Sequence, residues 1–451
     1  MDPVAFSEAV IMGLAPDAGL IVPESVPNVV DRLADWRALS YQDLVFEIAM
    51  LYTDLPAGEL RGIIAASYAR FEHPDIAPLH ALPDLHILEL FHGPTLSFKD
   101  IALQLLGNLF SHILAKDDSR LNILAATSGD TGSAAIEGVR GRDNINIFVM
   151  HPKGGVSALQ ERQMTTVLAP NVFNLAVSGS FDDCQGIMKS IFSDNEYKRA
   201  HALGSVNSIN WARIMAQIVY YFHSYFRLSE KLGCTQIQYA VPTGNFGDIL
   251  AGYYAKMMGL PIRRLILASN ENDILARFFN RGDYSRGAVV PTVSPAMDIQ
   301  VASNFERYLY YRANCDSAEV ARMMKSFAGG EPLRIAAGAA GVIDDLIRAR
   351  RVDRAETLAT IARVQRESGY VLDPHSAVGV AAGTALAEPG IPLVALATAH
   401  PAKFPDVIAE ACGVAARHPA LESLAGRESR QVELPAEECA VRDFIDMQLK
   451  K

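Results

Sequence analysis

Residues 91–100 read Phe-His-Gly-Pro-Thr-Leu-Ser-Phe-Lys-Asp and hold one lysine, Lys99, between a phenylalanine and an aspartate. The lysine follows a Gly-Pro turn and precedes residues 101–110, whose apolar spacing is typical of a helix. An ammonium group in apolar surroundings loses hydration and its pKa falls, as a Schiff-base lysine requires. The alternative interpretation is a hydrated lysine at a helix start, which is the commoner situation for a lysine. The rest of the chain decides between the two.

The composition indicates a soluble protein of enzyme size. With 451 residues the chain exceeds what one hydrophobic core usually serves, so we expect two or three domains. Half of the residues (50%) are hydrophobic, and a formal net charge of -10 points to neither nucleic acid nor an anionic membrane as a partner. The five cysteines form no CxxC pair, and we see no signal peptide and no apolar run near the ~20 residues that span a bilayer. We therefore expect a cytoplasmic protein.

The order of apolar patterns predicts an α/β fold. Helical spacing dominates the first ninety residues, at 34–52 and 58–71. Strand-length apolar runs then alternate with helical patterns, which predicts open, mainly parallel sheets. The expected strands are 85–90, 121–126, 145–150, 172–177, 237–241, 264–268 and 391–397. Between about 303 and 370 we expect a helical insertion without strands, with helices over 320–327, 342–349 and 354–366.

A Gly-rich turn over residues 242–248 (Pro-Thr-Gly-Asn-Phe-Gly-Asp) lies where an expected strand passes into a helix. Glycines allow close backbone approach, and a helix N-terminus offers unpaired amides to an anion. This turn therefore predicts a phosphate site, although it matches neither a Walker A loop nor a GxGxxG motif. An ordinary strand-to-helix turn remains the alternative.

A second turn, residues 127–132 (Thr-Ser-Gly-Asp-Thr-Gly), also follows an apolar strand. Its hydroxyls and amides are suited to binding a carboxylate. The alternative interpretation is that Ser128, Asp130 or Thr131 only caps the helix that follows. A third turn places Thr398 at the end of the last strand, where open α/β sheets bind ligands. Together with Lys99, these turns predict a pyridoxal phosphate (PLP) enzyme. No metal-ligand spacing and no GxSxG motif is present, so we expect neither a metal site nor a serine hydrolase.

These motifs, in this order, resemble the threonine synthase family, in its longer bacterial and fungal form within the fold type II PLP enzymes. The similarity covers nearly the whole chain and is specific because several strings occur together. The strings are residues 6–10, 13–20, 92–100, 126–132, 151–154, Gln160, Gln163, Met164, 207–213, 244–248, 294–299 and 398–404.

The resemblance implies roles for individual residues. Lys99 is implied to bind the cofactor covalently and to act as the catalytic base, and Thr398 to face the pyridine nitrogen. The phosphate loop is implied to comprise Gly244, Asn245, Phe246, Gly247 and Asp248. Substrate contacts are implied for Thr127, Ser128, Gly129, Asp130, Thr131 and Lys153.

The implied domains are an N-terminal domain (1–90), a PLP-binding α/β core (91–300), a helical insertion (301–375) and a return to the core with a C-terminal segment (376–451). The sequence departs from the family pattern at its start. Family members usually begin with a segment that contains a Ser-Thr-Arg-Gly motif, and this sequence starts just past that point. It also departs at Gly155, where family members carry a lysine or arginine. If that cation meets a substrate phosphate, Lys153 is the nearby replacement.

The resemblance implies a carbon-oxygen lyase of threonine biosynthesis, which converts O-phospho-L-homoserine and water to L-threonine and phosphate. One alternative is a related phospho-lyase that releases 2-oxobutyrate and ammonia. Another is a binding or regulatory protein that keeps the fold without the reaction. We expect a small phosphorylated amino acid as the partner, and a monomer or homodimer.

Overall fold

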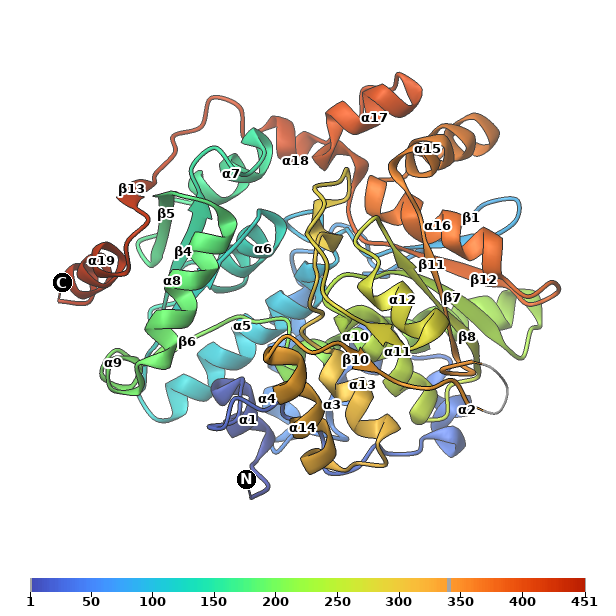
Figure 1. Ribbon diagram of the computed structural model, residues 1–451, viewed down its shortest axis with the longest axis horizontal. Coiled ribbons are helices and arrows are strands. Elements are labelled where there is room, and N and C mark those ends of the chain that lie inside the picture. Colours follow the sequence, from blue (N-terminus) through green and yellow to red (C-terminus); the bar gives the residue numbers. More distant parts are fainter. Residues whose placement is uncertain (1, 339–341, 451) are drawn as a thin grey trace.

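A computed structural model describes residues 2–338 and 342–450, and two open sheets form its centre (Figure 1). The six-stranded sheet is parallel except for the pair β1–β2. Its order is β1 (Leu79–Ala81), β2 (His86–Glu89), β12 (Leu393–Ala397), β7 (Ile237–Pro242), β8 (Ile262–Ser269) and β11 (Ile347–Arg351). The five-stranded sheet is entirely parallel, in the order β13 (Val432–Pro435), β5 (Val172–Ser178), β4 (Ile145–Pro152), β3 (Leu121–Ala126) and β6 (Leu203–Gly204). The prediction of an α/β fold with open, mainly parallel sheets is confirmed.

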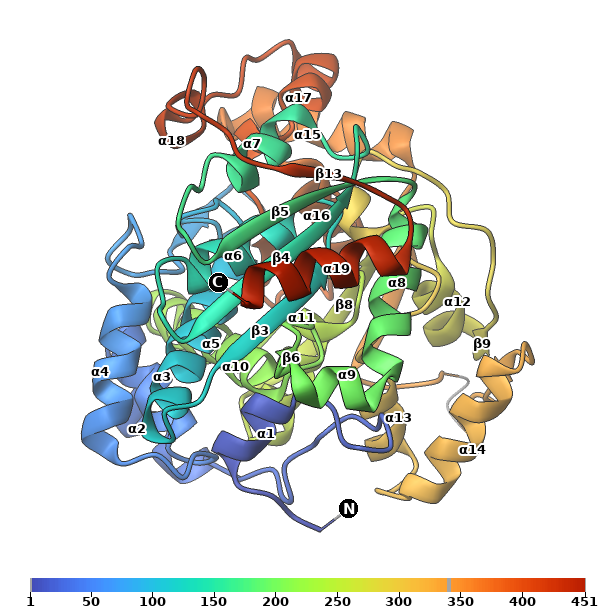
Figure 2. The ribbon, with the colours of Figure 1, turned by 90° about the vertical axis from the view of Figure 1, so that its left-hand side faces the viewer.

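Helices cover both faces of each sheet, so the central strands are apolar on both sides, as parallel sheets require. On the five-stranded sheet, α8 (Phe181–Ser193) and α19 (Glu438–Leu449) cover the outer face (Figure 2). On the six-stranded sheet, α15 (Arg354–Ser368) and α16 (Pro374–Leu386) cover the outer face. The inner faces of both sheets join one large apolar cluster.

Three helices in that cluster fill the space between the sheets. They are α5 (Lys99–Lys116), α10 (Trp211–Leu232) and α11 (Gly247–Met257). The 22-residue α10 is buried along most of its length, because apolar residues occur on all its sides. The N-terminal helices pack on α5 and α10. They are α1 (Phe6–Met12), η1 (Val30–Arg32), α2 (Leu33–Trp36), α3 (Tyr41–Ala49) and α4 (Ala57–Tyr68).

The N-terminal region is helical as expected, but β1 and β2 already belong to the six-stranded sheet. That sheet therefore begins before residue 91, and the four-domain division stays a prediction. The remaining elements are α6 (Asp130–Val139), α7 (Ala158–Thr165), α9 (Asn195–Ala200), α12 (Ile274–Arg281), β9 (Asp283–Tyr284), η2 (Pro295–Met297), β10 (Leu333–Arg334), η3 (Pro401–Lys403), α17 (Pro405–Cys412) and α18 (Pro419–Glu422).

The expectation of a strand-free helical insertion near 303–370 is wrong, because β10 and β11 both lie in this region. Helices α13 (Phe305–Arg312), α14 (Ser317–Ala328) and α15 are present, but the helix expected at 342–349 is absent and β11 extends the six-stranded sheet there. In β11 the buried Ile347 and Ala349 alternate with arginines, the period of an edge strand with one buried face. In a short segment the same apolar residues can fit the spacing of a helix or of a strand. Here the pairing of β11 with β8 decides for the strand.

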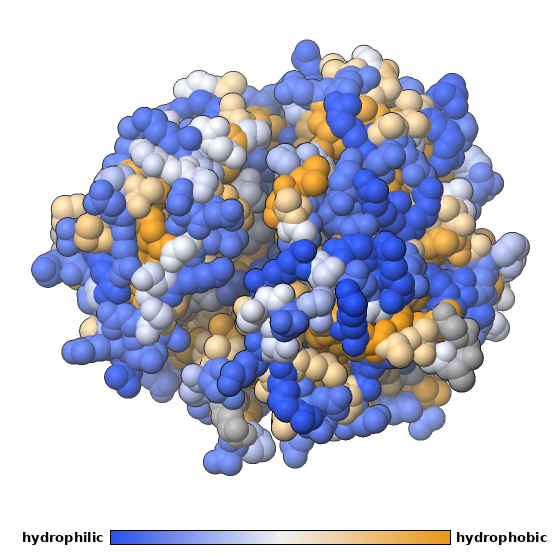
Figure 3. All heavy atoms as spheres, viewed as in Figure 1, coloured by the Kyte–Doolittle hydropathy of each residue, from blue (hydrophilic) through white to orange (hydrophobic). Residues whose placement is uncertain are grey.

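Hydrophilic residues predominate on the face seen in Figure 3, where apolar residues form separate small groups. Within the part of the chain that the structure describes, no helix is both long and apolar enough to cross a membrane. The carboxyl ends of β3, β7 and β12 each lead directly into one of the turns singled out above, at 127–132, 242–248 and Thr398. Parallel α/β sheets bind ligands at such strand ends.

Candidate active site

The turn before Lys99 is held by the carboxylate of Asp100. Asp100 accepts hydrogen bonds from the backbone amide and the hydroxyl of Thr95, both at 2.8 Å. Residue 93 must be glycine, because a Cβ atom there would lie 2.4 Å from the Cβ of Asp100. Burial raises the pKa of Asp100 to about 6 despite these hydrogen bonds. The turn thus fixes Lys99 as the first residue of α5.

The same segment bonds to the end of β12, which brings Lys99 next to Thr398. The amide of Phe98 donates to the carbonyl of Thr398 at 2.9 Å, and the amide of His400 donates to the carbonyl of Leu96 at 3.1 Å. On its other side, the amide of Thr398 donates to the hydroxyl of Ser376 at 3.1 Å. These backbone bonds leave the Thr398 side chain available to a ligand.

Lys99 shares the carboxylate of Asp130 with a second lysine, Lys403. The Lys99 Nζ atom lies 3.6 Å from Oδ2 of Asp130, and Lys403 Nζ lies 2.9 Å from Oδ1. Lys403 is completely buried and also donates to the carbonyl of Thr95 at 2.8 Å. The amide group of Gln160 completes the shell of Asp130 at 3.0 Å.

The charges in this cluster set the protonation of its members. Burial lowers the pKa of Lys99; Asp130 opposes this change, while Lys403 and Arg213 add to it. Burial raises the pKa of Asp130, but the two ammonium groups outweigh burial and hold that pKa below its usual range. The interpretation of Lys99 as a hydrated surface lysine is therefore wrong, since its side chain is 11% exposed.

The turn after β7 offers a row of free backbone amides. None of the amides of residues 244–249 donates to an acceptor within the described residues. Phe246 adopts a left-handed conformation (φ 64°), which a buried phenylalanine does only where its surroundings impose it. A Cβ atom at Gly244 would lie 2.8 Å from the carbonyl oxygen of Ala296, so only glycine fits there. Such an array of amides at a helix start suits a phosphate.

The side chain of Asp248 makes contacts away from this row of amides. Its carboxyl accepts hydrogen bonds from the hydroxyl of Tyr220 and, at 3.1 Å, from the hydroxyl of Tyr221. Burial raises the pKa of Asp248 to about 7, although both tyrosines oppose that rise. Asp248 can therefore serve a phosphate through its backbone amide, while its carboxyl fixes α11 against α10.

The turn after β3 is organised by Thr127. Its hydroxyl accepts from the amides of Gly129 at 3.0 Å and Gly132 at 2.8 Å. Gly129 has a φ of 134°, and a Cβ atom there would lie 2.5 Å from Gln160. The alternative that Ser128, Asp130 or Thr131 caps α6 is wrong, because the amide of Gly132 in the first turn of α6 donates to Thr127 and not to one of these three side chains. Ser128 is exposed and Thr131 is half-buried, which leaves both available to a substrate.

The segment after β4 does not bring a cation to this cluster. Lys153 is 52% exposed and forms an ion pair at 2.7 Å with Glu433 of β13, at the far edge of the five-stranded sheet. Gly155 is exposed, and a Cβ atom there would lie 2.6 Å from the ring of Pro152. The lysine or arginine that family members carry at position 155 thus has no replacement here, because Lys153 is paired with Glu433.

Three members of the site had no role in the sequence analysis: Lys403, Arg213 and Ser376. Lys403 and Arg213 lie in strings that carry the family resemblance, residues 398–404 and 207–213, and that is the signal by which they were identifiable. Their roles depend on contacts between distant segments, such as the bond from Lys403 to Thr95.

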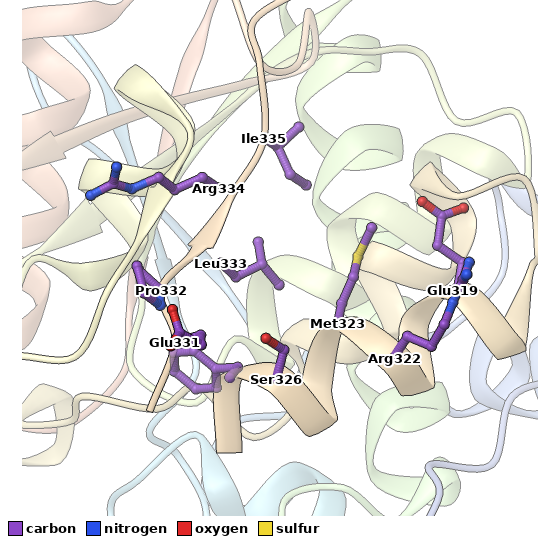
Figure 4. A pocket seen from close by; sticks show the side chains of 10 residues that line it. Glu319, Arg322, Met323, Ser326, Glu331, Pro332, Leu333, Arg334 and Ile335 are labelled. Atoms are coloured by element: carbon purple, nitrogen blue, oxygen red, sulfur yellow. The ribbon is translucent and has the colours of Figure 1, made fainter. Parts of the chain in front are cut away.

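A pocket of about 430 Å³ lies between α14 and residues 331–335 (Figure 4). Charged and apolar side chains line it, among them Arg322, Met323 and Leu333. None of its described lining residues is a lysine, and none belongs to the cluster around Lys99. It therefore cannot provide the covalent attachment that a Schiff-base cofactor needs.

Comparison with known families settles the relationship. Residues 1–68 match the family described as "Threonine synthase N terminus", 73–343 match "Pyridoxal-phosphate dependent enzyme" and 376–445 match "Threonine synthase, C-terminal". The chain belongs to the threonine synthase family. The predictions of this family, of a PLP-dependent enzyme and of its fold are confirmed.

Individual relatives of the threonine synthase family agree. The chain is similar to a threonine synthase of Pseudomonas aeruginosa, at 45% identity over 98% of this chain and 95% of that protein. A PLP-bound threonine synthase of Brucella melitensis has a similar structure, with a TM-score of 0.95, 43% identity and coverage of 99% and 97% of the two chains. A threonine synthase from yeast gives a TM-score of 0.94 at 40% identity, with coverage of 100% and 97%.

The residues of this chain fit the cofactor of the family. PLP needs an amine that reacts at neutral pH, and the pKa of Lys99 is lowered. It carries a phosphate, and the amides of residues 244–249 have no other acceptor in the described chain. Its ring nitrogen needs a polar neighbour, and Thr398 lies beside the Lys99 segment.

Proposed function

We propose that this member of the threonine synthase family converts O-phospho-L-homoserine and water to L-threonine and phosphate, the last step of threonine biosynthesis. The observation that carries the proposal is the position of Lys99. It lies buried beside Asp130 and at the end of β12, in a chain that matches threonine synthases over almost its full length. Bound PLP supplies an electron sink for the carbon–hydrogen bonds that must break.

The proposed contacts to the phosphate and the ring nitrogen of the cofactor come from two strand ends, those of β7 and β12. The backbone amides of Gly244, Asn245, Phe246, Gly247 and Asp248 bind the phosphate, supported by their lack of other acceptors among the described residues. Asn304 holds this loop in place, because its side-chain amide and its backbone amide both donate to the carbonyl of Asn245 at 3.1 Å. The hydroxyl of Thr398 faces the ring nitrogen as a neutral partner.

In the proposed reaction the freed Lys99 amine takes the α-proton of the substrate and later returns protons. A lysine can do this near neutral pH only when its pKa is lowered, as burial and the charge of Lys403 lower it here. Asp130 holds the amine at 3.6 Å, and Lys403 and Gln160 in turn hold Asp130. The proposal therefore assigns proton transfer to Lys99, and its positioning to these three residues.

The turn over residues 127–132 is proposed to bind the substrate carboxylate. The exposed hydroxyl of Ser128 and the half-buried Thr131 are available, and Thr127 fixes the turn through two amides. Hydroxyls and amides at the start of α6 suit a carboxylate because the helix dipole attracts negative charge. Asp130 contributes to this turn by binding the two lysines, and not by contacting the carboxylate.

The alternative phospho-lyase shares every residue assigned above and differs only in whether water is delivered to the β-carbon of the substrate. The names of the similar proteins favour threonine synthase. The two activities separate in one experiment, in which the purified enzyme and O-phospho-L-homoserine are assayed for threonine and for 2-oxobutyrate. We expect threonine in equal amount to released phosphate. Predominance of 2-oxobutyrate would sink the proposal.

The proposed location is the cytoplasm, supported by five cysteines that are all free thiols. The proposed partner is the small phosphorylated amino acid alone, without nucleic acid. The oligomeric state, monomer or homodimer, stays a prediction.

A further inference from the structure

Arg307 is the largest side chain that the described chain buries almost completely, and it carries a charge. It lies in α13, and the residue is 1% exposed. Burial lowers the pKa of Arg307 to about 10, so the guanidinium group remains charged at neutral pH. Its donors meet only carbonyl and amide oxygens, and no carboxylate among the described residues pairs with it. Burying a charge in this way is costly, so the hydrogen bonds of Arg307 point to a role beyond packing.

The guanidinium group connects segments that are far apart in the sequence. Its Nε and Nη2 atoms donate to the carbonyl of Ile21 at 3.0 Å and 2.7 Å, and Nη2 also donates to the carbonyl of Ile209 at 2.6 Å. Its Nη1 atom donates to the side-chain oxygen of Asn304 at 2.7 Å. The bond to Asn304 is the one that leads to the loop at 244–248.

Arg307 decides which way the side-chain amide of Asn304 faces. A guanidinium group offers only donors, so the oxygen of Asn304 must face Arg307 and its nitrogen must face away. That nitrogen donates to the carbonyl of Asn245 at 3.1 Å, and the backbone amide of Asn304 donates to the same carbonyl at 3.1 Å. With the side-chain amide reversed, two oxygens would face each other. The bond from Arg307 therefore fixes the carbonyl of Asn245.

The carbonyl of Asn245 and the amide of Phe246 belong to one peptide group. A chain of hydrogen bonds thus runs from Arg307 through Asn304 to this peptide, whose own donor has no acceptor within the described residues. Each bond in such a chain polarises the next, so the charge of Arg307 strengthens the amide of Phe246 as a donor. This amide is part of the row proposed above to bind the cofactor phosphate.

Helix α13 also holds the ring of Phe246. The rings of Phe305 and Tyr308 lie edge-on to it, with centroid distances of 5.5 Å and 5.9 Å. Phe246 has a φ of 64°, a conformation that is strained for a residue with a side chain and persists only where the surroundings fix it. The start of α13 therefore fixes both the peptide group and the side chain of Phe246.

We propose that Arg307 is a positioning residue for the cofactor: through Asn304 it orients and polarises the peptide between Asn245 and Phe246, so that the amide of Phe246 donates to the cofactor phosphate. This inference rests on the phosphate contacts of the proposed function. It also connects the N-terminal segment to cofactor binding, because the carbonyl of Ile21 holds the guanidinium group in place.

The test uses the full-length apoprotein and compares PLP with pyridoxal, which lacks the phosphate. Arg307→Met removes the first donor of the chain, and Arg307→Lys keeps the charge without the paired donors. Asn304→Asp keeps an acceptor for Arg307 but replaces the donor to Asn245 by an oxygen. Arg312→Met is the matched control, since Arg312 lies on the same helix and donates to the carbonyl of Ile343 instead. The dissociation constants of both compounds would be measured by absorbance.

We expect Arg307→Met to raise the dissociation constant of PLP about tenfold and to leave that of pyridoxal unchanged, because the chain acts on the phosphate alone. Arg307→Lys should raise it about threefold. Asn304→Asp should raise it about a hundredfold, since it also adds a negative charge near the phosphate. Arg312→Met should match the wild type. If Arg307→Met fails to fold, Asn304→Asp decides by the same criteria, because it retains the partners of Arg307.

Equal rises for PLP and pyridoxal in Arg307→Met would overturn the inference and leave Arg307 a role in stability alone. An unchanged dissociation constant of PLP would overturn it as well. Failure of the proposed function is distinguishable from both outcomes. A wild type that binds PLP and pyridoxal equally would refute the phosphate contacts themselves. A wild type that releases 2-oxobutyrate, but whose preference for PLP depends on Arg307, would refute the reaction and leave the inference standing.

Discussion

At the residue scale, the reactivity of Lys99 depends on how two ammonium groups share one carboxylate. Asp130 contacts Lys403 at 2.9 Å and Lys99 at 3.6 Å, so the shorter contact belongs to the lysine with no reacting role. The charge of Lys403 lowers the pKa of Lys99 and so offsets part of the attraction that Asp130 exerts on that amine. The arrangement holds the Lys99 amine in place without forcing it to stay protonated.

Replacing Lys403 tests this balance. In Lys403→Met the positive charge that helps to lower the pKa of Lys99 disappears, so that pKa rises and less neutral amine is present at pH 7. We therefore expect the acidic limb of the kcat–pH profile to move to higher pH. If this limb moves by about one pH unit, turnover at neutral pH should fall about tenfold. Lys403→Arg keeps the charge and should keep the wild-type limb. An unmoved limb in Lys403→Met would contradict the proposed role.

Thr398 offers a second test at the same scale. Its backbone bonds to Phe98 and Ser376 do not involve its side chain, so Thr398→Ala should keep the site intact. We expect the variant to bind PLP normally, as judged by absorbance, and to lose about tenfold in turnover, the effect of one hydrogen bond. Thr398→Ser should restore the activity. Full turnover in Thr398→Ala would show that the hydroxyl is not an electronic partner of the ring.

The sequence was informative about Lys99 and the phosphate loop because each lies in a short local motif. It placed Lys403 and Arg213 in strings that carry the family resemblance but did not show their roles, because these arise from contacts across long separations, such as Lys403 to Thr95. No local pattern distinguishes a buried lysine that holds a carboxylate from one that reacts.

At the element scale, the start of α5 depends on the fit between Gly93 and Asp100. In Gly93→Ala the new Cβ atom would meet the Cβ of Asp100 at 2.4 Å, and the turn would have to open. We expect a loss of about 1–3 kcal/mol in the free energy of unfolding, together with a lower PLP content. The matched control is Gly62→Ala in α4, where nothing lies within 4 Å of the new atom.

That control should stabilise the protein by about 1 kcal/mol, because alanine is the better helix former. Thermal midpoints and the absorbance of bound PLP check both variants. Equal behaviour of the two alanines would contradict the account of this turn.

The contact between α11 and α10 predicts a pH dependence of stability. Burial raises the folded-state pKa of Asp248 to about 7 from its ordinary 3.8, so the native state holds a proton that the unfolded chain releases. This contribution is fully present below the unfolded pKa and is lost as pH rises through about 7. Asp248→Asn should therefore lose less thermal stability than the wild type between about pH 4 and pH 8.

Thermal midpoints at several pH values measure this difference. Asp248→Asn still contains Asp100, whose pKa is raised to about 6, so part of the pH dependence of the thermal midpoint should persist in this variant. Parallel curves for wild type and Asp248→Asn would contradict the raised pKa.

The elements themselves were predictable where a strand is central and buried on both faces. The expected strand at 121–126 matches β3, and the expected strand at 172–177 matches β5 within one residue. The edge strand β11 was taken for a helix because only one of its faces is buried and its neighbour β8 comes from about 80 residues earlier in the chain. Pairing with a distant strand is a tertiary effect that local spacing does not contain.

At the scale of the whole molecule, the site exists only where the two sheets meet. Lys99 and Asp130 begin helices next to the five-stranded sheet, while the amide row and Thr398 follow strands of the six-stranded sheet (Figure 1). Bonds between the 91–100 segment and the end of β12 connect the two groups. The resemblance predicted these partners from their order in the chain, and the structure brings them together at neighbouring strand ends.

The most direct test of this account is the identity of the lysine that binds the cofactor, because two buried lysines share Asp130. The holoenzyme would be reduced with borohydride, digested and analysed by mass spectrometry for the cofactor-modified peptide. We expect modification at Lys99 alone, with none in Lys99→Ala. Modification at Lys403, or no modified lysine in an enzyme that makes threonine, would contradict it.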